Sequence, residues 1–195
     1  MVPPETEQTG CGYRFKVGWR NYRTRRPGLA GKNMATIFIS LGSNIDREHN
    51  TRVGIYALRQ VFGPLNLSSV YESESVGFDG DPFYNMVIAC DVDTPVHETN
   101  QILREIEDAN GRDRSGPKFS SRTLDLDLLL YDDLMMDENG LKLPRGEILI
   151  NAFVLWPMAE IAPQLKHPET GTSYAELWSA FDKTKEDLRP IEFTF

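Results

Sequence analysis

This sequence of 195 residues is poor in the features that mark membrane, secreted and zinc-binding proteins. It has two cysteines, Cys11 and Cys90, which form no disulfide framework and suit a reducing compartment. Its three histidines are not spaced as metal ligands, so a zinc site is disfavoured. No apolar run approaches the ~20 residues that a membrane-spanning helix needs. We therefore expect a soluble, cytoplasmic protein with no membrane partner.

Basic residues are scarce outside the N-terminal segment. Residues 1–33 hold seven Lys or Arg against two Glu, a net charge of +5, and the total of −8 leaves −13 for residues 34–195. Residues 34–195 are therefore too acidic to bind nucleic acid well, because proteins bind its phosphates through Lys and Arg side chains. The basic segment shows no hydrophobic periodicity, so we expect a disordered extension whose deletion leaves catalysis unchanged. A basic targeting segment is the alternative.

The rest of the chain predicts one folded domain over residues 34–195, because a hydrophobic content of 40% can supply a single core. Strands are expected at 36–41, 67–76, 83–92 and 122–131, with helices at 46–62 and 95–110. This order is that of an α+β ferredoxin-like sandwich, a mostly antiparallel sheet with helices packed on it. We expect these elements to be followed by a hairpin turning at Asn139-Gly140, an apolar segment at 152–157 and a last helix at 174–181.

Two carboxylates interrupt the fourth predicted strand. Asp125 and Asp127 are two residues apart, so their side chains share one face, with Cα atoms about 7 Å apart. Two ionised carboxylates held side by side repel one another unless a cation lies between them. The pair therefore indicates a site for a hard divalent cation, although an acidic pair on the solvated face of an ordinary strand remains the alternative.

The neighbourhood of the pair favours a phosphate ligand. Arg122 begins the same run, and residues 111–118 before it are basic and contain glycine. Magnesium is usually held by one or two carboxylates together with the phosphates of a substrate. We therefore expect a magnesium ion that bridges Asp125 and Asp127 to a phosphate-bearing ligand.

Several motifs follow one another along the chain: Leu-Gly-Ser-Asn at 41–44, residues 71–78, Phe-Tyr-Asn at 83–85, Arg-Thr-Leu-Asp-Leu-Asp at 122–127 and Phe-Val-Leu-Trp-Pro at 153–157. The block at 122–127 is the most specific of them. Together they resemble the hydroxymethyl-dihydropterin pyrophosphokinase family of folate biosynthesis. The resemblance covers about residues 35–180. It implies transfer of pyrophosphate from ATP to the hydroxymethyl oxygen of a reduced pterin, with AMP as the second product.

The resemblance also implies roles for individual residues. Asp125 and Asp127 would hold two magnesium ions, and Arg112 and Arg122 would complete the catalytic set by clamping phosphate oxygens. Residues 114 and 118 would belong to a closing lid. The ATP-binding positions would be Arg104, Glu107, Arg112, Arg114, Lys118, Arg122, Leu128, Leu141, Lys142 and Arg145. For Glu107, a solvated helix carboxylate is an equal alternative.

A flat pterin ring needs aromatic faces and fixed polar groups at its rim. By resemblance, the pterin-binding positions are Gly42, Ser73, Glu74, Val76, Phe83, Asn85, Phe119 and Phe153. Phe153 is the best stacking candidate, whereas plain core packing is the alternative for each aromatic taken alone. Asn85 is an amide among apolar strand residues, and burying it without partners would cost a few kcal/mol.

The sequence departs from the family pattern at a few positions. Arg145 stands where the family usually has a histidine, Asn151 replaces an arginine, and Phe119 replaces a tryptophan. Ser120 and Ser121 replace a small residue followed by proline, and Gly140 stands where an arginine sometimes lies. These changes leave two alternatives to an active monomeric enzyme: a divergent paralogue acting on another pterin, and a non-catalytic pterin- or nucleotide-binding module.

Overall fold

The structure, a computed structural model, describes residues 34–75, 80–112 and 121–195. One antiparallel sheet forms its centre, with the strand order β5-β1-β4-β3-β8 and a short strand β2 paired to β4. The sheet elements and the first two helices are β1 (Ala35–Ser43), α1 (Arg47–Phe62), β2 (Asn66–Leu67), β3 (Val70–Ser73), β4 (Phe83–Val92), α2 (Val96–Ala109), β5 (Asp125–Tyr131) and β8 (Leu188–Ile191). The predicted ferredoxin-like α+β fold is confirmed.

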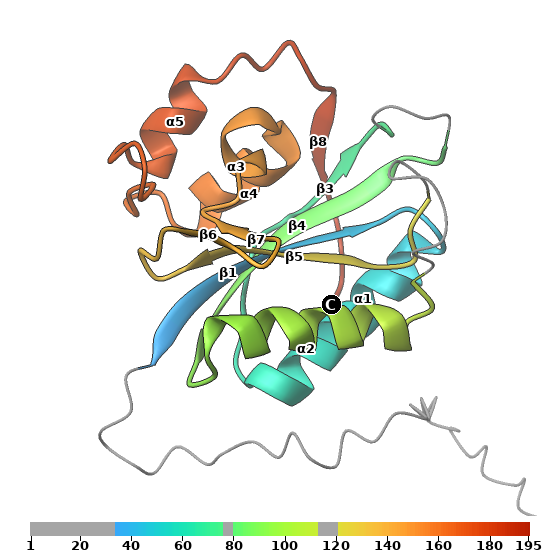
Figure 1. Cartoon of the computed structure of the whole chain (residues 1–195). Helices are drawn as coiled ribbons and strands as arrows, with labels where there is room; N and C mark the ends of the chain where they lie inside the picture. The colour runs from blue at the N-terminus through green and yellow to red at the C-terminus, as the bar shows by residue number, and fades with distance from the viewer. Residues whose placement is uncertain (1–33, 76–79, 113–120) are drawn as a thin grey trace, which may run out of the picture.

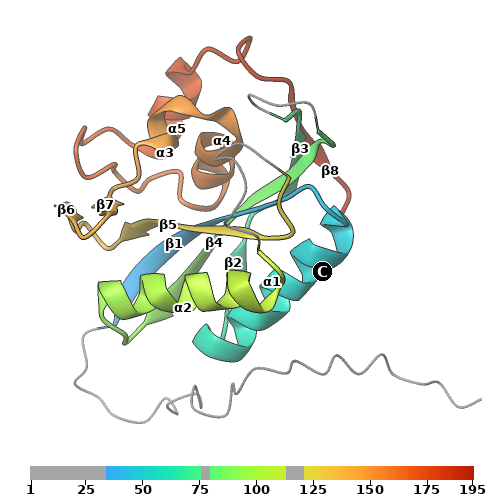
Figure 2. The same cartoon turned by 45° about the vertical axis from the view of Figure 1, so that its right-hand side comes forward.

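Helices cover both faces of this sheet (Figure 1). Helices α1 and α2 pack on one face, and α3 (Glu147–Ile150), α4 (Ala152–Ile161) and α5 (Tyr174–Ala180) pack on the other. The turned view in Figure 2 shows the same three layers. Alternation along each strand divides the apolar residues between two cores: on β4, Met86 and Ile88 enter the core under α1 and α2, whereas Val87 enters the core under α4 and α5.

The second predicted strand is interrupted. Residues 67–76 were expected to form one strand, but Ser68 and Ser69 separate β2 from β3. The Ser68 hydroxyl accepts a hydrogen bond from the Val87 amide at 3.0 Å, and the Ser69 amide donates to the Glu160 carboxylate. Two backbone amides here donate to side-chain oxygens instead of to carbonyls of a neighbouring strand. This explains why the predicted strand is divided into β2 and β3.

The C-terminal half holds more regular structure than the sequence indicated. The apolar segment at 152–157 is part of helix α4, which contains Pro157. The predicted hairpin is present as β6 (Met136–Glu138) and β7 (Leu141–Leu143), and its turn residues Asn139 and Gly140 both have positive φ. Strand β8 was not predicted, and it pairs with β3 at the end of the sheet opposite β5.

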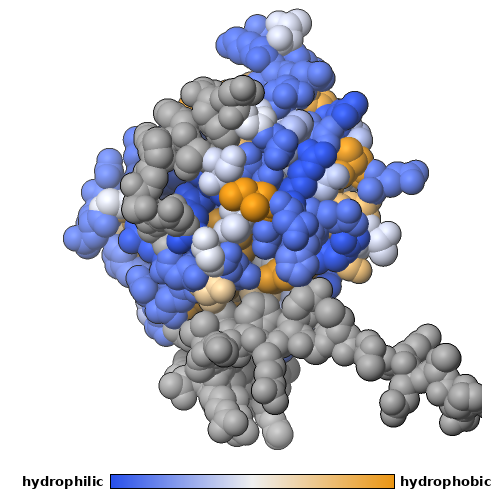
Figure 3. Space-filling model, turned by 90° about the vertical axis from the view of Figure 1, so that its right-hand side faces the viewer, coloured by the Kyte–Doolittle hydropathy of each residue, from blue (hydrophilic) through white to orange (hydrophobic). Residues whose placement is uncertain are grey.

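The surface over β8 and α1 is largely hydrophilic. Figure 3 shows this side of the molecule, where hydrophobic residues form small separate patches among polar ones. Of the helices that the structure describes, none combines the length and the apolar character required to cross a membrane.

Candidate functional site

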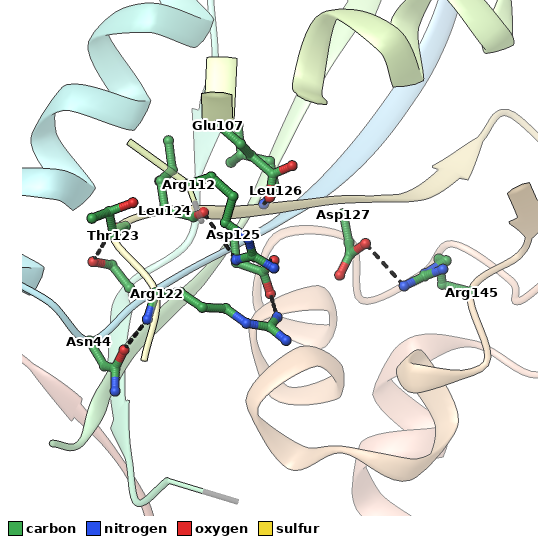
Figure 4. Close-up of polar contacts among 11 residues, drawn as sticks. Asn44, Glu107, Arg112, Arg122, Thr123, Leu124, Asp125, Leu126, Asp127 and Arg145 are labelled. Atoms are coloured by element: carbon green, nitrogen blue, oxygen red, sulfur yellow. Dashed lines mark hydrogen bonds and ion pairs between the residues drawn. The ribbon is translucent and has the colours of Figure 1, made fainter. Parts of the chain in front are cut away.

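Asp125 and Asp127 lie at the start of β5, the strand at one end of the sheet. Both side chains project to the same side of the strand (Figure 4). Leu126 and Leu128 alternate with them and are buried in the core under α1 and α2. The two carboxylates therefore face the α3–α5 side of the sheet, as the period of two predicts.

Two guanidinium groups hold Asp125. Arg112 Nη1 lies 2.9 Å from Asp125 Oδ1, and Arg122 pairs with Oδ2 of the same carboxylate. Arg112 also donates to the Leu124 carbonyl at 3.3 Å, which ties the end of the α2 segment to the start of β5. All three charged side chains keep less than a quarter of their surface exposed, so these ion pairs are shielded from bulk water.

Asp127 has a different environment. Arg145 Nη2 bridges Asp127 Oδ1 at 3.0 Å and Glu147 Oε1 at 3.2 Å. Loss of water around the carboxyl, and then the charge of Asp125, raise the pKa of Asp127 above its ordinary value, while Arg145 opposes the rise. The Asp127 side chain nevertheless remains 45% exposed, so a ligand can reach it.

The donor set of this centre suits magnesium. Within residues 34–75, 80–112 and 121–195, no three His, Cys, Asp or Glu side chains gather as a cage that could hold a metal alone. Two adjacent carboxylates with guanidinium groups beside them are instead what a magnesium–phosphate complex needs, because the ion retains water and substrate oxygens as its other ligands.

Glu107 proves not to be a solvated helix carboxylate. It is only 5% exposed near the end of α2, and its Oε1 accepts a hydrogen bond from the Leu126 amide at 3.1 Å. Leu126 lies between the two site carboxylates, on a strand that has one neighbour in the sheet formed by the described residues. Glu107 therefore satisfies an edge amide and helps to fix β5 beneath the site.

Ser43 and Asn44 fix the chain just before β5, a role that the sequence pattern did not predict. Ser43 Oγ donates to the Thr123 carbonyl at 2.6 Å, and Asn44 Oδ1 accepts from the Arg122 amide at 2.6 Å. Asn44 Nδ2 also donates to the Asp81 carbonyl at 3.1 Å. The Leu-Gly-Ser-Asn motif at 41–44 was the available signal, but in sequence it was only a weak part of the family resemblance.

The residues predicted to bind pterin meet the acidic centre through the strand register. Gly42 of β1 stands opposite Asn85 of β4 on one side and Asp125 of β5 on the other. A Cβ at Gly42 would lie 3.4 Å from Asn85 Oδ1, 3.8 Å from Phe83 Cδ1 and 3.9 Å from Asp125 Cβ. Glycine at position 42 thus adds no side-chain atom between these three side chains.

The amide of Asn85 has a fixed orientation. Asn85 Nδ2 donates to Ser73 Oγ at 2.9 Å, and both residues are buried. Phe153 is partly buried beside the core under α4 and α5, on the same face of the sheet, whereas Glu74 is exposed after the end of β3. The polar rim and one aromatic face expected of a pterin site therefore lie on the face that carries Asp125.

The other predicted positions are spread more widely. Arg104 and Lys142 are exposed on α2 and β7, whereas Leu128 and Leu141 are buried in the core under α1 and α2. The role of these four residues in ATP binding stays a prediction. Positions outside the described residues are Val76, Arg114, Lys118 and Phe119.

Comparison with known proteins gives a consistent result. The family model described as 7,8-dihydro-6-hydroxymethylpterin-pyrophosphokinase matches residues 38–163. The chain is 34% identical over 151 residues to 2-amino-4-hydroxy-6-hydroxymethyldihydropteridine pyrophosphokinase of Pseudomonas aeruginosa. This alignment covers 74% of this chain and 90% of that protein. It is 33% identical over 161 residues to folic acid synthesis protein fol1 of Pneumocystis carinii, covering 80% of this chain but 21% of that protein.

Solved structures share the fold at low sequence identity. Wild-type HPPK-DHPS of Plasmodium falciparum, crystallised with pterin and p-hydroxybenzoate, aligns with a TM-score of 0.60 at 12% identity. The alignment covers 76% of this chain and 43% of that chain.

Proposed function

The chain belongs to the 7,8-dihydro-6-hydroxymethylpterin-pyrophosphokinase family, and we propose that it transfers pyrophosphate from ATP to the hydroxymethyl group of 6-hydroxymethyl-7,8-dihydropterin. The products are the pterin diphosphate and AMP, and the reaction belongs to folate biosynthesis. The substrates are small molecules, and the enzyme acts as a monomer in the cytoplasm. The two unclustered cysteines support this location.

One observation carries the proposal: a continuous row of residues crosses the sheet from the predicted pterin positions to the predicted metal ligands. Asn85, Gly42 and Asp125 are consecutive partners across β4, β1 and β5. Strands in a sheet lie about 4.8 Å apart, so a pterin above Asn85 and a metal-bound phosphate at Asp125 would be neighbours. This spacing suits direct transfer between two bound substrates.

Charge placement suggests how the chain promotes the transfer. Arg112 and Arg122 pair with Asp125, and Arg145 pairs with Asp127. When ATP binds, the same guanidinium groups are in place to exchange a carboxylate oxygen for a phosphate oxygen, where they offset charge that develops during attack on the β-phosphorus. Two magnesium ions held by Asp125 and Asp127 would supply the remaining charge neutralisation.

Orientation is the second contribution. Asn85 and Ser73 would fix the polar edge of the pterin, and Phe153 would cover its ring. Holding the hydroxymethyl oxygen near the β-phosphorus replaces a bimolecular encounter by a local one. The substitution of Asn151 for an arginine removes one cation near α4, and Arg145 would compensate because it already reaches Asp127.

The test is a direct assay of the full chain with ATP, magnesium and 6-hydroxymethyl-7,8-dihydropterin. We expect AMP and a pterin diphosphate in equal amounts, with no ADP, and no product when magnesium is chelated. AMP formation only with a different pterin would support the divergent paralogue instead. Tight pterin binding without any AMP would support a binding module and would contradict the proposed transfer.

A further inference from the structure

The C-terminal segment, residues 186–191, lies outside the family match at 38–163, yet it contacts the proposed pterin site from two directions. We propose that this segment is a positioning element for the pterin, with Glu186 as its principal residue. The inference rests on the proposed function, because it concerns the pterin positions named there.

The first contact is with α4. Glu186 Oε2 accepts a hydrogen bond from the Phe153 amide at 3.3 Å. Phe153 is the second residue of α4, and the residue before this helix, Asn151, makes no side-chain capping bond. The first amides of a helix lack partners within the helix, and a carboxylate there is favoured by both hydrogen bonding and the helix dipole. Glu186 thus fixes the backbone that carries the proposed stacking aromatic.

The second contact is with β3. Strand β8 pairs antiparallel with β3, with Leu188 opposite Ser73 and Arg189 opposite Glu72. Ser73 accepts the hydrogen bond that orients the Asn85 amide. Pairing with β8 therefore holds the backbone on which the polar rim of the site depends.

A chain of charged side chains extends this contact to β4. Arg189 pairs with Glu72, whose other oxygen lies 2.7 Å from Arg47 Nη2. Arg47 donates to the Pro82 carbonyl at 2.9 Å, directly before Phe83. Because the Arg189 side chain is 72% exposed, its own contribution is small and Glu186 carries the main effect.

The experiment compares variants of the full chain. Pterin affinity is measured by fluorescence titration without turnover, and the KM values for pterin and ATP are measured in the direct assay of AMP formation described above. Glu186→Ala removes the acceptor for the Phe153 amide, and Glu186→Gln keeps a carbonyl oxygen at that place. Glu192→Ala is the matched control, since Glu192 is an exposed carboxylate near the same end of the chain.

We expect Glu186→Ala to weaken pterin binding about three- to tenfold and to raise the pterin KM equally, as loss of a helix cap predicts. The KM for ATP should stay unchanged, Glu186→Gln should restore most of the pterin affinity, and Glu192→Ala should match the wild type. Unchanged pterin affinity in Glu186→Ala, or a parallel rise of both KM values, would overturn the inference.

The proposed function can fail separately. A wild type that binds pterin but yields no AMP would refute the transfer, while weaker pterin binding by Glu186→Ala would still support the positioning role. A wild type that binds no pterin at all would overturn both.

Discussion

The two site carboxylates differ in their surroundings although they lie two residues apart. Asp125 is held by two guanidinium groups and is mostly buried, whereas Asp127 shares one guanidinium with Glu147 and stays more exposed. The pKa of Asp127 is raised, mainly by loss of water and then by Asp125. Asp127 is therefore the carboxylate with more to gain from a bound cation.

We predict that Asp127→Asn lowers turnover about a hundredfold or more, because a neutral amide binds magnesium too weakly to hold it beside the phosphates of ATP. Without magnesium, the variant should be at least as stable as the wild type at neutral pH. A carboxyl with a raised folded-state pKa binds more protons folded than unfolded, so its ionisation lowers stability as pH rises through that range. Turnover and thermal unfolding with and without magnesium measure both effects.

The control for this prediction is Asp133→Asn, which changes an exposed carboxylate in the turn after β5. It should alter neither turnover nor thermal unfolding. If Asp127→Asn unfolded the protein instead, the carboxylate would be structural and the metal site would have to be sought elsewhere.

At the scale of elements, the contact between α2 and β5 sets the site geometry. Helix α2 ends at Ala109, and Glu107 in its last turn reaches the Leu126 amide. An edge strand has one row of amides without sheet partners, so a buried side-chain acceptor can fix its position. In the sequence, the family resemblance suggested a position near the nucleotide for Glu107, and its place on a helix suggested solvent exposure. Neither reveals the edge strand beside α2.

We predict that Glu107→Ala lowers the free energy of unfolding by about 1–3 kcal/mol, since it leaves a buried amide without this acceptor. Its turnover should also fall, because Leu126 lies between the metal ligands. Glu107→Gln keeps a carbonyl oxygen and should retain the KM for ATP. Urea unfolding and steady-state kinetics test these expectations.

Glu105→Ala on the same helix provides a comparison in which a carboxylate is lost from a partly exposed position. A change within about 0.5 kcal/mol is expected there. A large rise in the KM for ATP in Glu107→Gln would show that the negative charge itself serves the nucleotide, contrary to the structural role.

At the scale of the whole molecule, one sheet joins two cores. The core under α4 and α5 includes Tyr174, which lies beside His167 with ring centroids 6.1 Å apart. His167 is 1% exposed, and its Nδ1 accepts from the Glu169 amide at 3.3 Å. Burial lowers the pKa of His167 below its usual value, and Glu169 partly opposes this. Protonation would therefore disturb a core that shares its strands with the site.

We predict that the wild type loses stability as pH falls below about 6.5, where unfolded histidine gains a proton that folded His167 resists. The sign follows because a histidine with a lowered folded-state pKa binds more protons in the unfolded chain. His167→Gln should show a smaller decline in the free energy of unfolding between about pH 7 and pH 5. Urea unfolding at several pH values measures the slope.

His97→Gln is the matched control, because His97 is exposed on α2. Its stability should follow the wild-type pH dependence. An identical slope in His167→Gln and the wild type would mean that other groups cause the loss of stability.

Unfolding of the wild type followed by fluorescence and by circular dichroism should show one common transition, since the two cores share every central strand.

The sequence by itself determined strands β1, β4 and β5, helices α1 and α2, and the placement of Asp125 and Asp127 on one face of β5. These features depend on local periodicity, because alternate side chains of a strand must point to the same side. The turn at Asn139-Gly140 is equally local, since both residues accept positive φ.

Only the tertiary structure decided which distant groups meet around those carboxylates. It brought Glu107 to Leu126 and Glu186 to Phe153, and it interrupted the second strand at Ser68. Each of these contacts joins residues far apart in sequence or depends on a backbone group left free by the sheet. Local patterns carry no record of such partners, because the need for them arises only when strands and helices pack together.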